Sequence, residues 1–146
     1  MPVMGIPGGC ADLYYPAPGC WQKAESKVSE GQSPIFSKTY DFILWLLNHT
    51  ENYPRSERFR LAKRLEDGMY AFHEYLVRAS RARKPYPLLC DAVVELEKVR
   101  LYVRLAHARN HMTQQQYVYA AEQLVEIGRI LGGWMRTLPE GGRRVE

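Results

Sequence analysis

The sequence predicts an all-α protein, an antiparallel up-down-up-down four-helix bundle that follows an irregular N-terminal tail. Apolar residues recur at spacings of three and four in three long segments, which places them on one face of a helix. A shorter apolar segment precedes these three and supplies the fourth helix. The expected connections are about three to eight residues long, and such short loops make successive helices antiparallel. No segment shows the strict alternation that is typical of a strand.

The first 32 residues are expected to form a flexible extension. They carry repeated prolines and glycines without a sustained apolar period, which argues against regular structure. The predicted organisation is therefore an extension over residues 1–32, the bundle over 33–138 and a short tail over 139–146.

The first expected helix covers about residues 34–50. Ser33 is a suitable N-cap and Pro34 suits the first helical turn. The second expected helix runs from Arg55 to about Arg83 and ends before a proline. Its apolar stripe, which we expect to be buried, consists of Phe59, Ala62, Leu65, Met69, Phe72 and Leu76.

The third expected helix begins near Pro87 and ends at about Arg109, with a stripe formed by Leu89, Ala92, Leu96, Val99, Val103 and Ala106. The fourth has the clearest start signal. Thr113 and Gln116 have the spacing of a capping box, and Met112 can pack on Tyr117 as a hydrophobic staple. Its expected core stripe is Tyr117, Ala120, Leu124, Ile127, Leu131 and Trp134.

Composition sets limits on function. The 146 residues include 20 Lys and Arg against 16 Asp and Glu, a net charge of +4 that favours anionic partners. The longest apolar run, residues 42–47, is far shorter than the ~20 residues that a membrane helix needs. The N-terminus lacks the pattern of a secretory signal, so we expect a cytoplasmic protein. Three cysteines without paired spacing indicate free thiols, with no structural metal and no cofactor.

The basic residues are concentrated in two segments. Residues 55–64 contain five basic residues and one acidic residue, and residues 78–109 contain eight and three. An antiparallel hairpin would bring the start of the second helix near the end of the third. The resulting patch would suit phosphate, because several cationic contacts release counterions together; alternatively, these residues form a solvated face with scattered ion pairs. The candidate binding residues are Arg55, Arg58, Arg60, Lys63, Arg64, Arg100, Arg104 and Arg109.

A catalytic alternative rests on two histidines. His107 and His111 are too few for a zinc site and have no intervening Glu of the HExxH kind, so we expect no metal site. The pairs Arg104 with His111 and Arg100 with His107 resemble the spacing of HEPN ribonucleases, in which His would act as the base and Arg would bind the scissile phosphate. A leucine follows each arginine here, where those enzymes usually have a polar residue. No nucleophile system or phosphate loop is recognisable, so we predict no catalytic residues.

Three glycines lie close together in the last expected helix: Gly128, Gly132 and Gly133. Each costs about 1 kcal/mol relative to Ala inside a helix. Gly128 and Gly132 are one turn apart, so beside Trp134 they form a candidate face for close helix packing or oligomer contact. The alternative is that the helix ends near Gly132.

The segment from Met112 to Tyr117, followed by Ala120, Leu124 and the run Glu-Ile-Gly-Arg-Ile-Leu-Gly-Gly-Trp at 126–134, resembles the last helix of the accessory variability determinant (Avd) proteins of diversity-generating retroelements. Tyr40, Phe59, Leu61 and Leu65 give weaker support. The resemblance spans about residues 33–138, so residues 1–32 lie outside it, as they would if the start codon were placed too far upstream.

This resemblance implies a nonenzymatic accessory protein that forms a homopentameric barrel of bundles. It further implies binding to the reverse transcriptase of the retroelement and to its template RNA, in support of mutagenic cDNA synthesis. The eight basic candidates would then contact the polymerase or nucleic acid, and the glycines with Trp134 would lie at oligomer or helix contacts. A HEPN-like ribonuclease and a general nucleic-acid-binding bundle remain the alternatives.

Overall fold

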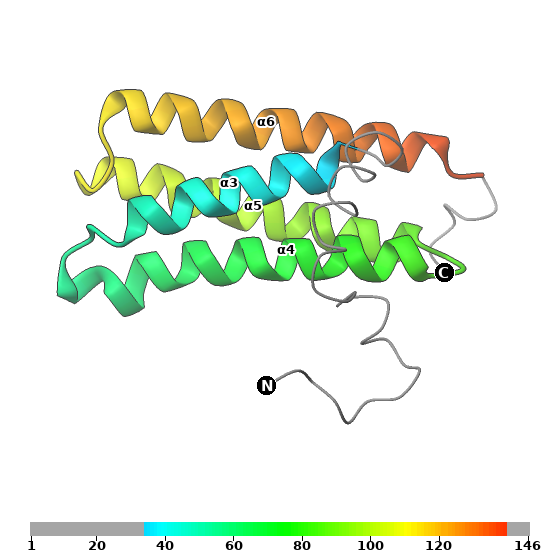
Figure 1. The fold of residues 1–146 in the computed structure, drawn as a ribbon, viewed down its shortest axis with the longest axis horizontal. Helices are drawn as coiled ribbons and strands as arrows, with labels where there is room; N and C mark the ends of the chain where they lie inside the picture. The colour runs from blue at the N-terminus through cyan, green and yellow to red at the C-terminus, as the bar shows by residue number, and fades with distance from the viewer. Residues whose placement is uncertain (1–33, 140–146) are drawn as a thin grey trace, which may run out of the picture. The chain divides into compact units, whose positions relative to one another are not determined.

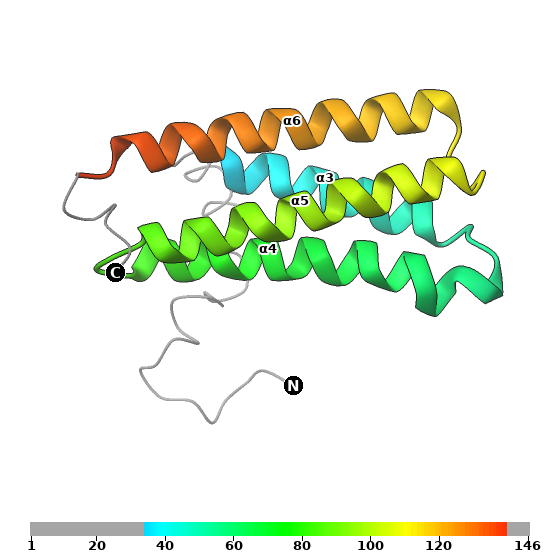
Figure 2. The same ribbon diagram turned by 180° about the vertical axis from the view of Figure 1, so that it is seen from behind.

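The computed structural model describes residues 34–139, and within that range it is an antiparallel four-helix bundle without strands (Figure 1). The helices are α3 (Ile35–Thr50), α4 (Lys63–Arg81), α5 (Tyr86–Ala108) and α6 (Gln114–Thr137). Each runs opposite to the one before it, and α3 packs on both α4 and α6, which closes the ring (Figures 1 and 2). The predicted fold class is confirmed. The expected tail over 1–32 and nearly all of 139–146 lie outside the described residues.

Local sequence signals explain the starts of the helices. Thr113 Oγ1 accepts a hydrogen bond from the Gln116 amide at 3.1 Å, and Gln116 Oε1 accepts one from the Thr113 amide at 2.9 Å. The predicted capping box is therefore confirmed. Pro87 occupies the first turn of α5, where its missing amide costs no helical hydrogen bond. The expected Ser33 cap lies outside the described range.

The predicted stripes of α5 and α6 form most of one side of the core. All six α5 residues of the stripe are buried, as are Ala120, Leu124, Ile127 and Leu131 of α6. Tyr117 and Trp134 are only partly buried and pack against this core. Each large side chain that is removed from water contributes about 1.5–3 kcal/mol, so the stripes hold the four helices together.

One predicted core residue is wrong: Phe59 is 75% exposed, and Leu61 is buried in its place. The chain between α3 and α4 begins with a 3₁₀ turn, Arg55–Glu57, and continues as a π-helix, Arg58–Ala62. In the π-turn the Lys63 amide donates to the carbonyl of Arg58, five residues earlier. Leu61, four residues before Leu65, lies on the buried stripe at ordinary helical spacing, and Phe59, six residues before Leu65, falls to one side of it. The wider turn rotates Phe59 further outward.

Glycine brings α4 and α5 together at Gly68. A Cβ atom built there would lie 2.6 Å from Cγ2 of Val99, a distance that real Cβ atoms do not adopt. Gly68 and Val99 are both buried. Gly68 was not among the glycines predicted to pack closely, although it lies between Leu65 and Met69 of the predicted stripe.

None of the described helices is long and apolar enough to cross a membrane.

Candidate nucleic-acid interface

The start of the α4 segment and the end of α5 meet at one end of the bundle. Arg109, which directly follows α5, donates from Nε to Oε1 of Glu57 at 2.9 Å, and its Nη2 donates to the same oxygen. These two residues are 52 positions apart in the sequence. The hairpin that the sequence suggested therefore places the first basic segment beside the end of the second, near Arg109.

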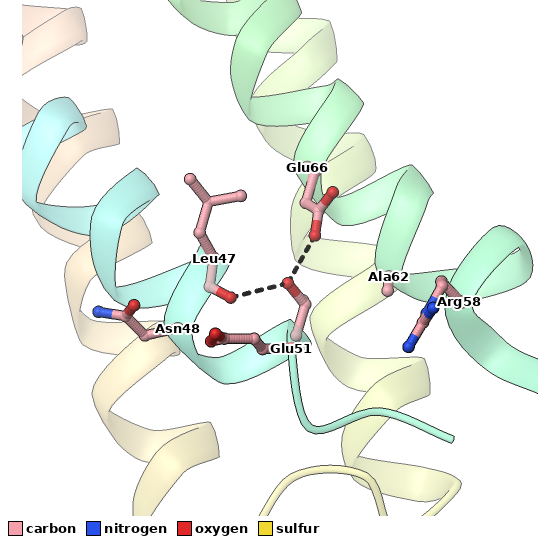
Figure 3. Close-up of a pocket in the computed structure, with 7 residues that line it drawn as sticks. Leu47, Asn48, Glu51, Arg58, Ala62 and Glu66 are labelled. Atoms are coloured by element: carbon pink, nitrogen blue, oxygen red, sulfur yellow. Dashed lines mark hydrogen bonds between the residues drawn. The ribbon is translucent and has the colours of Figure 1, made fainter. Parts of the chain in front are cut away.

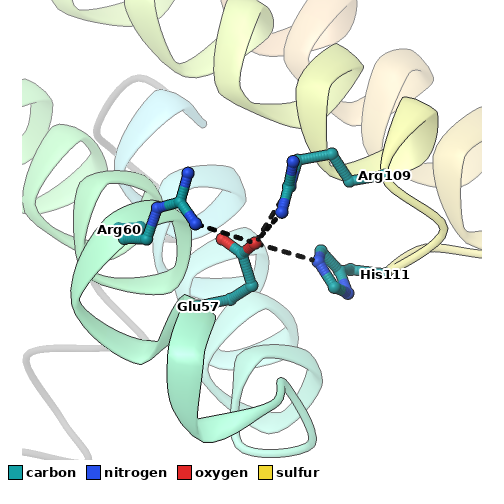
Figure 4. A network of polar contacts seen from close by, with 4 residues as sticks. All are labelled: Glu57, Arg60, Arg109 and His111. Carbon is teal, nitrogen blue, oxygen red and sulfur yellow. Dashed lines mark hydrogen bonds and ion pairs between the residues drawn. The ribbon is translucent and has the colours of Figure 1, made fainter.

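Glu57 is the centre of this contact (Figure 4). Its carboxylate is buried, and Arg109, Arg60 and His111 all point toward it. Arg60 Nη1 lies 3.9 Å from Oε1 and His111 Nε2 lies 3.5 Å from it. The hydrogen bonds from Arg109 hold the pKa of Glu57 below its usual range, although burial acts in the opposite direction. Removal of Arg109 would take away the two hydrogen bonds to this buried carboxylate and leave Arg60 at 3.9 Å and His111 at 3.5 Å, which is costly.

Four of the eight candidate cations already have partners within the protein. Arg109 and Arg60 face Glu57, and Lys63 pairs with Asp67 at 2.7 Å. Arg100 pairs with Glu97 and donates from Nη2 to the Leu124 carbonyl at 3.2 Å. Among residues 34–139, no ion-pair or hydrogen-bond partner is assigned to the side chains of Arg55, Arg58, Arg64 and Arg104.

The carboxylates near these four arginines are unevenly placed. Residues 98–121, from the last part of α5 to the start of α6, include four Lys or Arg and no Asp or Glu. Four acidic residues lie near the start of α4: Glu57 is buried, Glu66 accepts a hydrogen bond from Thr50 at 2.6 Å, Asp67 pairs with Lys63, and Glu51 is exposed. The four arginines are exposed near this end of the bundle. Arg58 borders the cleft between α3 and α4, Arg64 lies between α4 and α5, and Arg104 lies between α5 and α6, so the positively charged surface is spread around this end. We call this surface the basic end and define it by Arg55, Arg58, Arg64 and Arg104.

Beneath the basic end, rings pack in series. Trp45 stacks on His49 with centroids 5.2 Å apart, and His49 meets Tyr53 at 5.0 Å. Tyr53 in turn lies 5.3 Å from His111, and its hydroxyl is 3.0 Å from Nε2 of His49. Burial lowers the pKa of His49 and raises that of Tyr53, with Glu57 adding to the latter shift. Both side chains are therefore neutral near pH 7.

The histidines of the ribonuclease alternative have other contacts. His107 stacks on Tyr117 with centroids 4.4 Å apart, and His111 faces Glu57. Arg100, the expected partner of His107, is held by Glu97 and by the Leu124 carbonyl. Of the two Arg and His pairs, only Arg104 remains without such a contact among the described residues.

A cleft of about 490 Å³ lies between the end of α3 and the start of α4 (Figure 3). Leu47 and Ala62 supply its apolar lining, and Glu51 and Glu66 supply two carboxylates. Arg58 stands at its edge and is the only basic residue among those that line it. The two carboxylates repel phosphate, so the cleft itself is an unfavourable phosphate site. Phosphate would instead contact arginine side chains that point away from the cleft.

The candidate glycines lie on α6 with different surroundings. A Cβ atom on Gly128 would stand 2.7 Å from Nη2 of Arg100 and 3.4 Å from Cδ2 of Leu96, so this glycine faces α5 of the same chain. Near Gly132 and Gly133 a Cβ atom would meet only Arg136 of its own helix, at 3.6 Å and 4.0 Å. Trp134 is tilted against Phe36 of α3 with centroids 6.4 Å apart. The α6 helix continues to Thr137, so it does not end at the glycines.

Within the described range, no group of three or more His, Cys, Asp or Glu residues could hold a metal ion. Cys90 is a partly buried free thiol; Cys10 and Cys20 lie outside that range.

Comparison with known protein families identifies the family of this bundle. A family model described as bAvd-like matches residues 34–138, which is the whole bundle. A search of curated proteins finds no match. The Avd-like family consists of accessory proteins that are generally non-catalytic. The chain therefore belongs to the bAvd-like family and is an Avd-type accessory protein.

Proposed function

We propose that this protein binds the reverse transcriptase of a diversity-generating retroelement together with its template RNA, and so supports mutagenic cDNA synthesis. The family match over residues 34–138 carries the proposal. The basic end supplies the physical means of contact with RNA. It offers four exposed guanidinium groups that form no ion pair with residues 34–139, and arginine binds phosphate oxygens in a bidentate manner.

Self-association is part of the proposal, with a homopentamer as the form that the family resemblance implies. Several apolar side chains of α5 and α6 are 41–60% exposed in the single chain: Val94, Leu101, Leu105, Val118 and Val125. Val94, Leu101 and Leu105 are spaced seven and four residues apart and so share one face of α5, and Val118 and Val125 are seven apart on α6. Exposed apolar faces are typical of protein interfaces. Five copies would also repeat the basic end, and linked weak contacts bind nucleic acid more tightly than one.

Light scattering tests the assembly. Replacing Val125, which is 60% exposed, with Glu should reduce the assembly without unfolding the bundle. Gly128 is a poorer choice, because a side chain there would meet Arg100 within the same subunit. A wild-type protein that is monomeric at micromolar concentration would contradict the proposed oligomer.

RNA binding is tested by neutralising the basic end. Changing Arg55, Arg58, Arg64 and Arg104 together to Gln removes four charges per subunit and leaves the Glu57 contact intact. Affinity for template RNA should fall and its dependence on salt should become shallower, because fewer counterions are released.

A matched control removes four charges elsewhere: Arg78, Arg83, Lys84 and Arg129, each changed to Gln. These residues lie away from the basic end, and the pairs of Arg78 with Glu74 and of Arg129 with Glu126 are largely exposed, so their loss costs little stability. The control should keep most of the affinity. Equal losses in both variants would show that net charge, not the basic end, determines binding.

A further inference from the structure

Phe59 is unusual among the aromatic residues at this end of the bundle. Its side chain is 75% exposed, whereas Trp45 stacks on His49 and His49 meets Tyr53 edge to face. Phe59 has no ring contact among the described residues. A single exposed apolar residue is common and does not by itself indicate a function. At Phe59, the backbone conformation and the surrounding charges are two further observations that do.

Phe59 lies within the π-helix Arg58–Ala62. Six residues at about 100° each would place Phe59 about 120° around a regular helix from Leu65, at the flank of the buried stripe. The wider π-turn rotates Phe59 further toward solvent, while Leu61, four residues before Leu65, stays on the stripe. Single π-turns are rare in proteins and occur frequently at functional sites. Here Leu61 occupies the core and the phenyl ring of Phe59 lies on the surface.

The ring is surrounded in sequence by cations. Arg55, Arg58, Arg60 and Arg64 all lie within five residues of Phe59 and are exposed. The only carboxylate in residues 54–64 is Glu57, which is buried against Arg109. An aromatic face flanked by arginines is the arrangement with which proteins hold single-stranded nucleic acid: the ring stacks on a base and the cations bind the phosphates on either side.

We infer that Phe59 stacks on an unpaired base of a single-stranded nucleic acid, while Arg55, Arg58 and Arg64 hold the adjoining phosphates. The inference rests on the proposed RNA binding and specifies its substrate class. In a duplex, both faces of each internal base are covered by neighbouring bases, so a side chain cannot stack on it. The arginines of the basic end attract single-stranded and duplex nucleic acid alike. Phe59 can stack only on the bases of a single strand, so it favours that form.

The test measures the affinity of the full chain for a labelled, unstructured RNA of about 12 nucleotides and for a duplex of equal length, within the site sizes typical of single-strand binding. Phe59→Ala should weaken single-strand binding by about 5- to 150-fold, the effect of losing one stacked base. Duplex affinity should stay within about twofold. Phe59→Trp should keep or improve single-strand binding, because it retains a stacking face.

Two further measurements separate stacking from other causes. Phe59→Ala should lower affinity without changing the salt dependence, since no charge is lost, whereas the basic-end variant makes that dependence shallower. Tyr70→Ala, which removes another exposed aromatic side chain of α4, should bind single strands like the wild type. The melting temperature of Phe59→Ala should match that of the wild type, because the ring is mostly in solvent.

Several results would overturn the inference and leave RNA binding intact: equal single-strand affinity for wild type and Phe59→Ala, or equal losses for single strand and duplex. Weakened binding to the reverse transcriptase with unchanged RNA affinity would show instead that Phe59 contacts protein. A wild-type chain that binds neither form of RNA would refute the proposed function itself.

Discussion

Gly68 determines how closely α4 and α5 approach, and Gly68→Ala measures that contact. A Cβ atom at this position would lie 2.6 Å from Cγ2 of Val99, whereas ordinary contact begins at 3.4 Å. The valine methyl group, or the helices themselves, would therefore have to move by 0.8 Å, the difference between these two distances. Val99 is fully buried and β-branched, so a change of rotamer gives little relief.

Two effects of the substitution oppose each other. Alanine favours the helix by about 1 kcal/mol relative to glycine. Overpacking a filled core costs typically about 1–3 kcal/mol. Because the nearest atom belongs to a buried branched side chain, we expect the upper part of that range, and a net loss of about 1–2 kcal/mol in the free energy of unfolding.

Urea unfolding followed by circular dichroism measures this loss. A second variant, Gly68→Ala with Val99→Ala, removes the clashing methyl groups, so the new methyl group of residue 68 no longer overpacks the contact. The Gly68→Ala change should therefore be harmless or stabilising in the Val99→Ala background. If Gly68→Ala is as stable as the wild type, the close approach of α4 and α5 at this glycine is wrong.

Two other substitutions test the interior. Thr39 is fully buried and its hydroxyl has no hydrogen-bond partner within the described structure, so Thr39→Val should raise the free energy of unfolding by about 1 kcal/mol in urea titrations; a loss would reveal an undetected partner. Arg109 lowers the folded pKa of Glu57, so the stability that this carboxylate contributes is present above its ordinary pKa of 4.5 and is lost as pH falls through the folded value. Glu57→Gln should therefore flatten the decline of stability with acid in that range. The lowered pKa of His49 causes a separate decline as pH falls below 6.5, which both proteins share and which cancels in their difference. Identical acid profiles for wild type and Glu57→Gln would contradict the account of the Glu57 contact.

Much of the bundle follows from local sequence patterns. Stripes with helical spacing predicted the buried faces of α5 and α6, because a core excludes water from whichever side of a helix is apolar. The capping box at Thr113 was predictable because both of its hydrogen bonds join residues three apart. Helix faces and helix caps can therefore be predicted from the sequence, because each depends on residues only a few positions apart.

The register at the start of α4 was misassigned. Leu61 stands four residues before Leu65, on the stripe, whereas Phe59 stands six residues before it, to one side. The spacing of three between Phe59 and Ala62 led the prediction to the wrong side chain. The π-turn, in which the Lys63 amide donates to the Arg58 carbonyl, leaves no signal in side-chain spacing and moves Phe59 further from the core.

The basic end was predictable as a region and not as a set of residues. Charge counting and antiparallel topology indicated that the two basic segments meet. Which arginines remain available depends on Glu57, whose burial brings it into contact with Arg109 from 52 positions away. Counting charges gives Arg109 and Arg104 the same weight. In the structure, Arg109 contacts the buried carboxylate of Glu57, whereas Arg104 is exposed to solvent.

The central proposal is that this bundle supports cDNA synthesis through its basic end. The most direct measurement is the yield of cDNA made by the retroelement's reverse transcriptase on its template RNA, with and without the purified protein. We expect the wild type and the control variant to raise the yield, and the variant lacking Arg55, Arg58, Arg64 and Arg104 to raise it much less at equal concentration. An unchanged yield with wild-type protein, or full support from the basic-end variant, would contradict the proposal.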